Sequence, residues 1–558
     1  MKALPLLILH WGLFCLSTSS LSAAPPLATL PVPDDGTYEL TFSFPIKSVQ
    51  PGDFDGDGVL DFVMRSNNIG IEGTQYIEAR LNNGKRLWAV NTESKRQCRL
   101  LTMLCWDFNN DGRWEVYYEY WDIQTEGWRH CIVDGLSGQK LADAPTPYNM
   151  ENEYDTEAVL MPMGAIAYRY GIPRIIMCTD GSIENGNDGR LWMFETWNGV
   201  EFSLRPLWYY HRPLSMAHDM IRTADVDLDG FDDEILAGRV VINSDGSLRY
   251  DLQGTDSDHT QIGFYGSDYS GLVYVVPDER YGLITAVKAI DGTVIWEHKM
   301  RDIFPDWTHL HWGWISDKDP SIPGAEMMAR DRNTPAWAYL RVNDGKILHH
   351  STKTQFDYGT TDFWKAPLIY DPAEERIRID SRRTLLWDDD AFYDAVPESI
   401  DNSLQARGDL GGSGSEEIWG LKDSITLLMT FNLNSAASPS RWQNRHYRQD
   451  VAQFSTGYSC AYINPLVIPQ KTEERFAAEI QISGKKVIDQ RLVIQKGESV
   501  NFTNLAASEA AQYFWDFGDG TMSNEKNPIH TFSSGGVYPV YLRMTPQDLT
   551  AVPPERKN

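Results

Sequence analysis

Long apolar runs are scarce in this chain. After the first 23 of its 558 residues, no stretch reaches the roughly 18 apolar residues that a transmembrane helix needs. Residues 1–23 instead follow the pattern of a secretory signal peptide, with Lys2 before a short apolar segment and the small residues Ser20-Leu-Ser-Ala-Ala24 behind it. The sequence therefore predicts an exported protein, secreted or periplasmic, with no membrane partner.

Cysteine and positive charge are also scarce. The chain has 6 cysteines, and Cys15 lies in the expected signal peptide. The others show no metal-type spacing, so no disulfide framework is indicated, and one or two bridges stay open. Against 78 acidic residues stand 50 Lys and Arg, which gives a formal net charge of −28. This excess argues against nucleic acid or an anionic membrane surface as a partner.

The acidic residues recur in three loops of one pattern. Oxygen-bearing side chains stand at alternate positions, a glycine permits a sharp turn, and an acid closes the loop at the ninth position. Hard oxygen ligands at this spacing suit Ca²⁺. The three candidate ligand sets are Asp53, Asp55, Asp57 and Asp61; Asp107, Asn109, Asp111 and Glu115; and Asp225, Asp227, Asp229 and Asp233. Their flanks are strand-like rather than helical, which excludes EF-hands and predicts that each loop fixes the start of a β-strand.

A second pattern recurs between these loops, namely a glycine turn followed by an apolar strand. It occurs at Asn83-Gly84, Ser137-Gly138, Asp245-Gly246, Asp291-Gly292 and Asp344-Gly345. Asn-Gly and Asp-Gly favour hairpins in which both central residues have positive φ. The two patterns alternate with a period of about 40–60 residues, which is the size of a propeller blade. The sequence thus predicts an all-β fold whose main domain, residues 37–470, is an eight-bladed β-propeller.

A charged linker is expected at residues 471–487, followed by a small β domain at 488–547 and a tail at 548–558. The centre of this domain reads Trp515-Asp-Phe-Gly-Asp-Gly520, and Asn527-Pro-Ile-His-Thr-Phe532 follows. These strings resemble the PKD domain, an immunoglobulin-like β-sandwich. The resemblance implies a role as a spacer or in substrate contact rather than in chemistry.

The order of motifs over about residues 40–465 is similar to that of the rhamnogalacturonan lyases of polysaccharide lyase family 11, which are calcium-rich eight-bladed propellers. The stretches that carry the resemblance are Ala224–Ile235, Ile315–Glu326 and Leu404–Trp419. The resemblance implies β-elimination between rhamnose and galacturonate in an acidic polysaccharide. A base would take the proton α to the uronate carboxyl, and a cation or Ca²⁺ would stabilise the developing negative charge.

The resemblance also implies a substrate-binding calcium site. Its positions fall on Asp219, Asp256, Asp258 and Glu279, for which solvated loop acids are the simpler interpretation. The catalytic Lys of the family has no counterpart in Glu398–Ser403, and a family Arg falls on Pro367. Lys365 and Arg383 are therefore candidate replacement cations, and His259 is the candidate base.

Two histidines, His309 and His311, lie on the same side of a predicted strand and form a second candidate site for a metal or a base. A pair packed among tryptophans is the simpler interpretation. The preferred functional hypothesis is a monomeric, Ca²⁺-dependent lyase for rhamnogalacturonan-type polysaccharide. Two alternatives stay open: a lyase for another uronate polymer such as ulvan, and a non-catalytic propeller that binds glycans or proteins.

Overall fold

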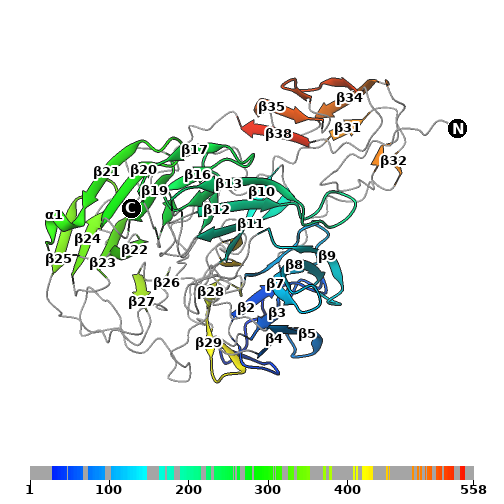
Figure 1. Ribbon diagram of the computed structural model, residues 1–558, viewed down its shortest axis with the longest axis horizontal. Coiled ribbons are helices and arrows are strands. Elements are labelled where there is room, and N and C mark those ends of the chain that lie inside the picture. The colour runs from blue at the N-terminus through cyan, green and yellow to red at the C-terminus, as the bar shows by residue number, and fades with distance from the viewer. Residues whose placement is uncertain are drawn as a thin grey trace.

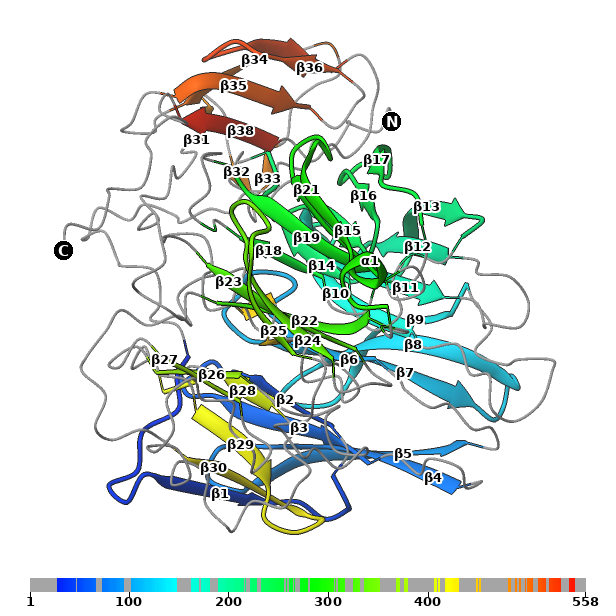
Figure 2. The same cartoon turned by 90° about the vertical axis from the view of Figure 1, so that its left-hand side faces the viewer.

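The structure is a computed structural model in which nearly every described element is a β-strand (Figures 1 and 2). From residue 28 to 351 it describes all but residues 47, 67–72, 95–101, 148–161, 170–171, 181–188, 215, 217–220, 228–231, 255–256, 258–259, 264, 266–270, 279–281, 306, 308–309, 317–324 and 332–335. Beyond 351 it describes residues 368–371, 376–379, 406–408, 410–411, 417–430, 448–449, 451–452, 480–482, 487–488, 491–492, 497, 499–504, 510–517, 521–532 and 541–546. The expected signal peptide and tail lie outside these ranges.

Six antiparallel sheets follow one another along the chain, and the four strands of each pair in chain order. Sheet 1 consists of β2 (Ser48–Gly52), β3 (Asp61–Arg65), β4 (Gly73–Arg80) and β5 (Arg86–Ser94). Sheet 2 consists of β6 (Met103–Trp106), β7 (Glu115–Asp122), β8 (Gly127–Asp134) and β9 (Lys140–Pro145). Sheet 3 consists of β10 (Pro162–Arg169), β11 (Ile172–Asp180), β12 (Gly189–Phe194) and β13 (Pro206–Arg212).

Sheets 4 to 6 repeat this arrangement. Sheet 4 consists of β14 (Arg222–Ala224), β15 (Glu234–Ala237), β16 (Val240–Ile242) and β17 (Leu248–Asp251). Sheet 5 consists of β18 (Gln261–Gly263), β19 (Val273–Asp278), β20 (Leu283–Lys288) and β21 (Val294–Lys299), and the one-turn helix α1 (Met300–Ile303) follows it. Sheet 6 consists of β22 (Leu310–Ser316), β23 (Glu326–Asp331), β24 (Trp337–Arg341) and β25 (Ile347–Ser351).

A strand near the N-terminus completes the last four-stranded sheet of this region. Strand β26 (Leu368–Asp371) pairs with β27 (Arg376–Ile379), and the closing sheet then contains β28 (Ala406–Gly408), β29 (Glu417–Leu421) and β30 (Thr426–Thr430). Its fourth strand is β1 (Thr37–Thr41), which places Leu40 opposite Leu427. Joining both ends of a domain in one sheet is typical of propellers, because it leaves no long free edge. The all-β class is confirmed, and the count of eight blades stays a prediction.

Polar side chains on the first strands tie neighbouring sheets together. The Gln50 amide of β2 donates a 2.9 Å hydrogen bond to the carbonyl of Met103 in β6. The Thr223 hydroxyl of β14 donates a 2.8 Å bond to the carbonyl of Ile166 in β10. First strands are buried along their whole length, as in β6, whereas fourth strands such as β13 alternate between exposed and covered residues. The first strands are therefore the inner strands, and the fourth strands form the outer edge.

Apolar side chains fill the space between facing sheets. Between sheets 2 and 3, Trp106 and Ile132 pack with Ile175 and Phe194 in one cluster. Burying such side chains is the main favourable term in folding, at about 25 cal/mol per Å² of apolar surface. The core is thus divided among the junctions between sheets, so each junction contributes separately to stability.

The described cysteines form no disulfide. Cys105, Cys131 and Cys178 are buried free thiols, whereas Cys98 and Cys460 lie outside the described residues.

In the part of the chain that the structure describes, no helix is long and apolar enough to cross a membrane.

The glycine turns form as predicted, but with a different turn geometry. Gly84, Gly138, Gly246, Gly292 and Gly345 all have positive φ, between 70° and 87°. The Asn, Asp or Ser before the glycine does not, which corrects the expectation of positive φ at both central positions. A register shift accompanies each hairpin, for example between Ala79 and Arg80. These turns therefore match a tight turn that ends in a glycine bulge, where only the glycine needs the left-handed conformation.

An aromatic side chain from the preceding sheet packs against several of these glycines. A Cβ atom at Gly138 would lie 2.7 Å from the Trp88 ring. The Trp88 indole N–H also donates a 2.7 Å hydrogen bond to the carbonyl of Gly135 in the same turn. The equivalent pairs are Trp208 with Gly246, Tyr250 with Gly292, and Trp296 with Gly345. We call each such pair an aromatic latch, because it fixes the outer strand of one sheet to the turn of the next.

The strands after residue 480 lie together at one end of the molecule (Figures 1 and 2). One sheet joins β31 (Ile480–Ile482), β34 (Ser499–Asn504) and β37 (Ile529–Thr531), and another joins β35 (Ala510–Asp516), β36 (Met522–Ser523) and β38 (Tyr541–Pro546). The short β32 (Val487–Ile488) pairs with β33 (Arg491–Leu492). Phe502, Trp515 and Phe517 are buried and in mutual ring contact, so this region has its own small core.

Candidate calcium loops

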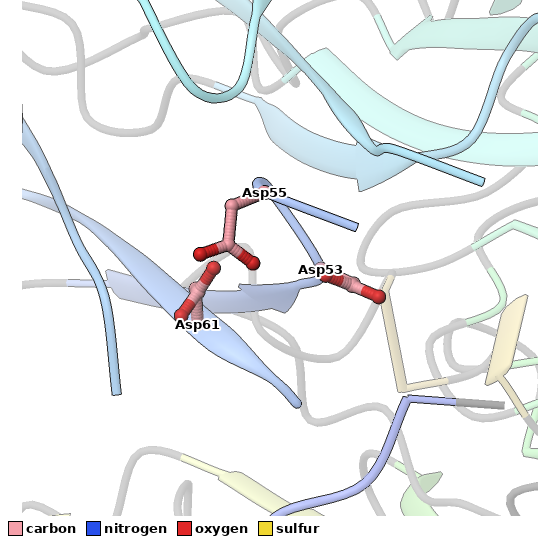
Figure 3. Close-up of side chains that lie close together, drawn as sticks. All are labelled: Asp53, Asp55 and Asp61. Atoms are coloured by element: carbon pink, nitrogen blue, oxygen red, sulfur yellow. The ribbon is translucent and has the colours of Figure 1, made fainter. Parts of the chain in front are cut away.

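The first Asp loop, between β2 and β3, gathers three carboxylates. One oxygen from each of Asp53, Asp55 and Asp61 lies within 4.8 Å of the others. Figure 3 shows the Asp55 and Asp61 carboxylates turned toward each other across the loop. Asp57 is exposed and lies outside this group of three, and its carboxylate accepts a 2.8 Å bond from the amide of Val59.

The main chain of this loop is wrapped around Asp53. Its two carboxylate oxygens accept hydrogen bonds from the amides of Gly56, at 2.8 Å, and Gly58, at 3.0 Å. Both glycines have positive φ, 77° and 84°, a conformation that side chains with a Cβ rarely adopt. The Asp-Gly sequence thus dictates a tight loop whose acids converge.

The buried negative charge of the first loop favours binding of a cation. Asp61 is fully buried, and burial raises the pKa of its carboxyl to about 7. Burial also raises the pKa of Asp53. None of the ion pairs among the described residues involves Asp53, Asp55 or Asp61. Clustered carboxylates without a counter-ion are costly, so this donor set, with oxygen atoms alone, fits Ca²⁺.

The second loop repeats the backbone hydrogen bonds of the first, with an amide side chain among its candidate ligands, but its acids do not form a converging group of three. Asp107 accepts 3.0 Å hydrogen bonds from the amides of Asp111 and Gly112. Burial raises the pKa of Asp107 to about 6 and that of Glu115 to about 9. Asn109 stands where the first loop has Asp55, so this loop offers one negative charge fewer at that position. The second set is also composed of oxygen ligands that suit Ca²⁺.

In each loop, the backbone amide of the residue after the first Asp donates a hydrogen bond to the acid that closes the loop. This bond identifies the closing acid. The bonds run from the amides of Phe54 to Asp61 (3.2 Å), Phe108 to Glu115 (2.9 Å) and Val226 to Glu234 (2.8 Å). Each of these acids is also the first residue of a strand, in β3, β7 and β15. The structure therefore brings Glu234, and not Asp233, together with Asp225 and Asp227. The third loop is one residue longer, and counting nine positions missed Glu234. The strand start was the signal that would have found it.

The third loop also contacts a cation of the chain itself. One guanidinium nitrogen of Arg249, on β17, donates 3.0 Å hydrogen bonds to both Asp227 and Glu234. Arg249 is mostly buried, with its side chain 17% exposed. Burial nonetheless raises the pKa of Glu234 to about 9. The Asp225, Asp227 and Glu234 group thus has part of its charge balanced without metal, unlike the first loop.

The remaining predicted site residues lie outside the described residues. They are Asp219, Asp229, Asp256, Asp258 and Glu279 among the metal ligands, and His259, Lys365 and Arg383 among the catalytic candidates. His309 also lies outside, and the side chain of His311 is not described. The described part of the site is therefore the set of Asp loops on the scaffold.

The succession of four-stranded antiparallel sheets is also the fold of several solved polysaccharide lyases. The exotype rhamnogalacturonan lyase YesX superposes with a TM-score of 0.58 at 17% identity, over 76% of this chain and 81% of the lyase. The Bacillus licheniformis rhamnogalacturonan lyase PL11 gives 0.56 at 18% identity, over 78% and 79%. Rhamnogalacturonan lyase YesW gives 0.56 at 18%, over 78% and 80%. The chain therefore has the fold of these enzymes.

The C-terminal region matches a known domain family. Residues 486–551 match the PKD domain, which confirms the resemblance drawn from the Trp515-Asp-Phe-Gly-Asp-Gly520 string. No curated protein matches this chain in sequence.

Proposed function

We propose that this protein is a secreted, Ca²⁺-dependent polysaccharide lyase that cleaves rhamnogalacturonan-type polysaccharide by β-elimination. The observation that carries the proposal is the similarity in fold to three rhamnogalacturonan lyases over more than three quarters of this chain. Because fold alone does not fix function, the acid loops are the second support: they are oxygen-ligand sets built into the same scaffold.

The catalytic roles are assigned to cations and a base in the chain. His259 would remove the proton at C5 of the uronate, and Lys365 or Arg383 would neutralise the carboxylate beside it. The bond between C4 and the leaving oxygen then breaks, that oxygen takes up a proton, and a C4–C5 double bond remains. The products carry one unsaturated uronate end and one new hydroxyl end.

Calcium would bind at two kinds of site in this protein. The three Asp loops would hold structural ions, and Asp219, Asp256, Asp258 and Glu279 would hold one at the substrate. When bound there, Ca²⁺ supplies positive charge opposite the uronate carboxylate. The described residues bear on the structural ions only, through the carboxylates gathered in the first and third loops.

The experiment is to incubate the purified mature protein with rhamnogalacturonan I, with Ca²⁺ or with a chelator, and follow the ultraviolet absorbance of the unsaturated uronate. We expect a rise in absorbance that chelator abolishes and added Ca²⁺ restores. His259→Ala should lose the rise while keeping the thermal unfolding profile of the wild type. An intact protein that produces no absorbance change on rhamnogalacturonan I would exclude that substrate.

One observation favours a second hypothesis, namely a lyase for a different uronate polymer. The segment Glu398–Ser403 holds no Lys where the lyases have theirs, so a different uronate polymer such as ulvan is the alternative substrate. The same assay with ulvan distinguishes the two. Binding of either polymer without any absorbance change would instead favour a non-catalytic glycan-binding propeller.

A further inference from the structure

A cavity of about 470 Å³ opens between the outer strands of sheets 2 and 3. On one side it is lined by β9, including Ala142 and Ala144, and on the other by Phe194, Phe202 and the chain entering β13. It lies on the outer edge of the scaffold and contains none of the Asp loop residues. A cavity of this size holds one or two sugar rings or a ligand of similar volume.

The cavity exists because this junction lacks the aromatic latch. Trp88, Tyr250 and Trp296 each follow their turn glycine by four positions, and each packs against the next sheet. The residue four positions after Gly138 is Ala142. The facing sheet differs as well, because residues 195–205 replace the tight turn between β12 and β13. The space that an indole or phenol ring fills at the other described junctions is therefore open here.

The lining combines ring surfaces with a few polar groups. Phe202 is half-buried and is braced by the Trp197 ring, with 4.9 Å between centroids. Pro145 and Pro206 add further apolar surface. Because β9 is the edge strand of sheet 2, its outer backbone amides and carbonyls are not used within that sheet. Ser203 also lines the space, and its hydroxyl oxygen accepts a 3.2 Å hydrogen bond from the Arg205 amide.

A buried imidazole lies behind this lining. His130 on β8 stands opposite Ala144 in the strand register and packs edge-on against Phe194, with 4.8 Å between ring centroids. It is fully buried, and its Nδ1 contacts the Tyr117 hydroxyl at 3.2 Å. Its Nε2 has no hydrogen-bond partner among the described residues. Buried polar atoms are rarely left unpaired, but His130 does not itself line the cavity, so its Nε2 marks an unusual core position beside the cavity rather than a contact for the ligand.

We propose that this cavity is a non-catalytic binding site for a neutral sugar residue. The phenyl and proline rings suit the C–H faces of a pyranose ring, and the edge backbone and Ser203 suit its hydroxyls. The charged residues of the lining are already paired, Arg205 with Glu195 at 3.1 Å and Asp143 with Arg129 at 2.7 Å. The described part of the lining therefore offers no free positive charge for a uronate. The site lies beyond the proposed lyase chemistry and does not depend on it.

The test is binding by the full chain, without turnover. Saturation-transfer NMR and titration would use methyl α-L-rhamnoside, methyl β-D-galactoside and methyl α-L-arabinoside as neutral probes, and methyl α-D-galacturonoside as the charged comparison. We expect at least one neutral probe to bind in the millimolar range and the galacturonoside to bind at least about tenfold more weakly. Ala142→Trp should abolish neutral binding, because it fills the cavity as Trp88 fills the preceding junction.

Two further variants make the result decisive. Phe202→Ala removes the ring platform without adding bulk, so it should weaken binding at least about tenfold even if Ala142→Trp fails to fold. Val294→Ala, an exposed residue on β21, is the control and should bind as the wild type does. No binding of any neutral probe, preferential binding of the galacturonoside, or unchanged binding by folded Ala142→Trp or Phe202→Ala would each overturn the proposal.

Discussion

The Arg249 guanidinium donates a 3.0 Å hydrogen bond to the Glu234 carboxylate, so the third Asp loop contains a cation of its own. We expect Arg249→Gln to lower stability by about 3 kcal/mol in chelator, because it leaves the buried Glu234 carboxylate without its partner. In Ca²⁺ the loss should be smaller, since the ion can take over the charge. Thermal unfolding with and without Ca²⁺ measures this difference.

Arg205→Gln is the matched control for that variant, because Arg205 also pairs with a glutamate but is 67% exposed. Exposed pairs contribute about 0–1 kcal/mol, so this control should change little in either condition. An equal loss for Arg249→Gln with and without Ca²⁺ would contradict the idea that arginine and calcium share the third loop.

Asp61→Asn tests the first loop, which has no such cation. Asp61 is fully buried and accepts bonds from the amides of Phe54 and Asn82, one on each carboxylate oxygen. Asparagine, of equal size, therefore removes the charge together with one of these two acceptors. We expect one Ca²⁺ fewer per chain by elemental analysis after desalting. Asp302→Asn, at an exposed position, should keep the wild-type metal content, and an unchanged content in Asp61→Asn would remove this loop from the calcium sites.

Stability without metal should depend on pH in an unusual direction. Burial raises the pKa of Glu115 to about 9 and that of Asp61 to about 7, whereas in the unfolded chain such carboxyls titrate near about 4. Between these values the folded state holds protons that the unfolded chain has released. The free energy of unfolding in chelator should therefore fall as pH rises from about 5 to about 9.

Calcium should reverse this trend, because it binds the ionised carboxylates. The measurement is the midpoint of thermal unfolding against pH, in chelator and in Ca²⁺. A midpoint that rises with pH in chelator would mean that these acids ionise normally in the folded protein.

The aromatic latches predict a difference between two glycine turns. Gly84 and Gly138 have similar positive φ, 83° and 71°. A Cβ at Gly138 would meet the Trp88 ring at 2.7 Å, whereas at Gly84 its nearest neighbour would be a Leu40 methyl group at 3.9 Å. Both alanine variants share the backbone strain, and only Gly138→Ala adds a steric clash, of about 1–3 kcal/mol. Equal losses of stability in urea would show that the latch does not contribute.

How far the sequence predicts this structure depends on whether a feature is local. The glycine turns, the strand starts at Asp61 and Glu115, and the C-terminal PKD domain follow from short strings, and each is confirmed by the fold or the family match. These features form from neighbouring residues, so a pattern in the chain is enough to find them.

The features that the sequence did not predict join residues far apart in the chain. Glu234 replaces Asp233 in the third group because of one extra residue, and Arg249 reaches the loop from a strand two hairpins later. The cavity at Ala142 is visible only when the outer strands of several sheets are compared in space. Pairing and packing across sheets cannot be deduced from a local motif, so these relations required the structure.

The central claim is β-elimination, and the most direct measurement is the mass of the products from rhamnogalacturonan I. We expect oligosaccharides that end in an unsaturated uronate, each one water lighter than the corresponding hydrolysis product, formed only when Ca²⁺ is present. Products of full hydrolytic mass, or an unchanged polymer with folded, calcium-loaded protein, would contradict it.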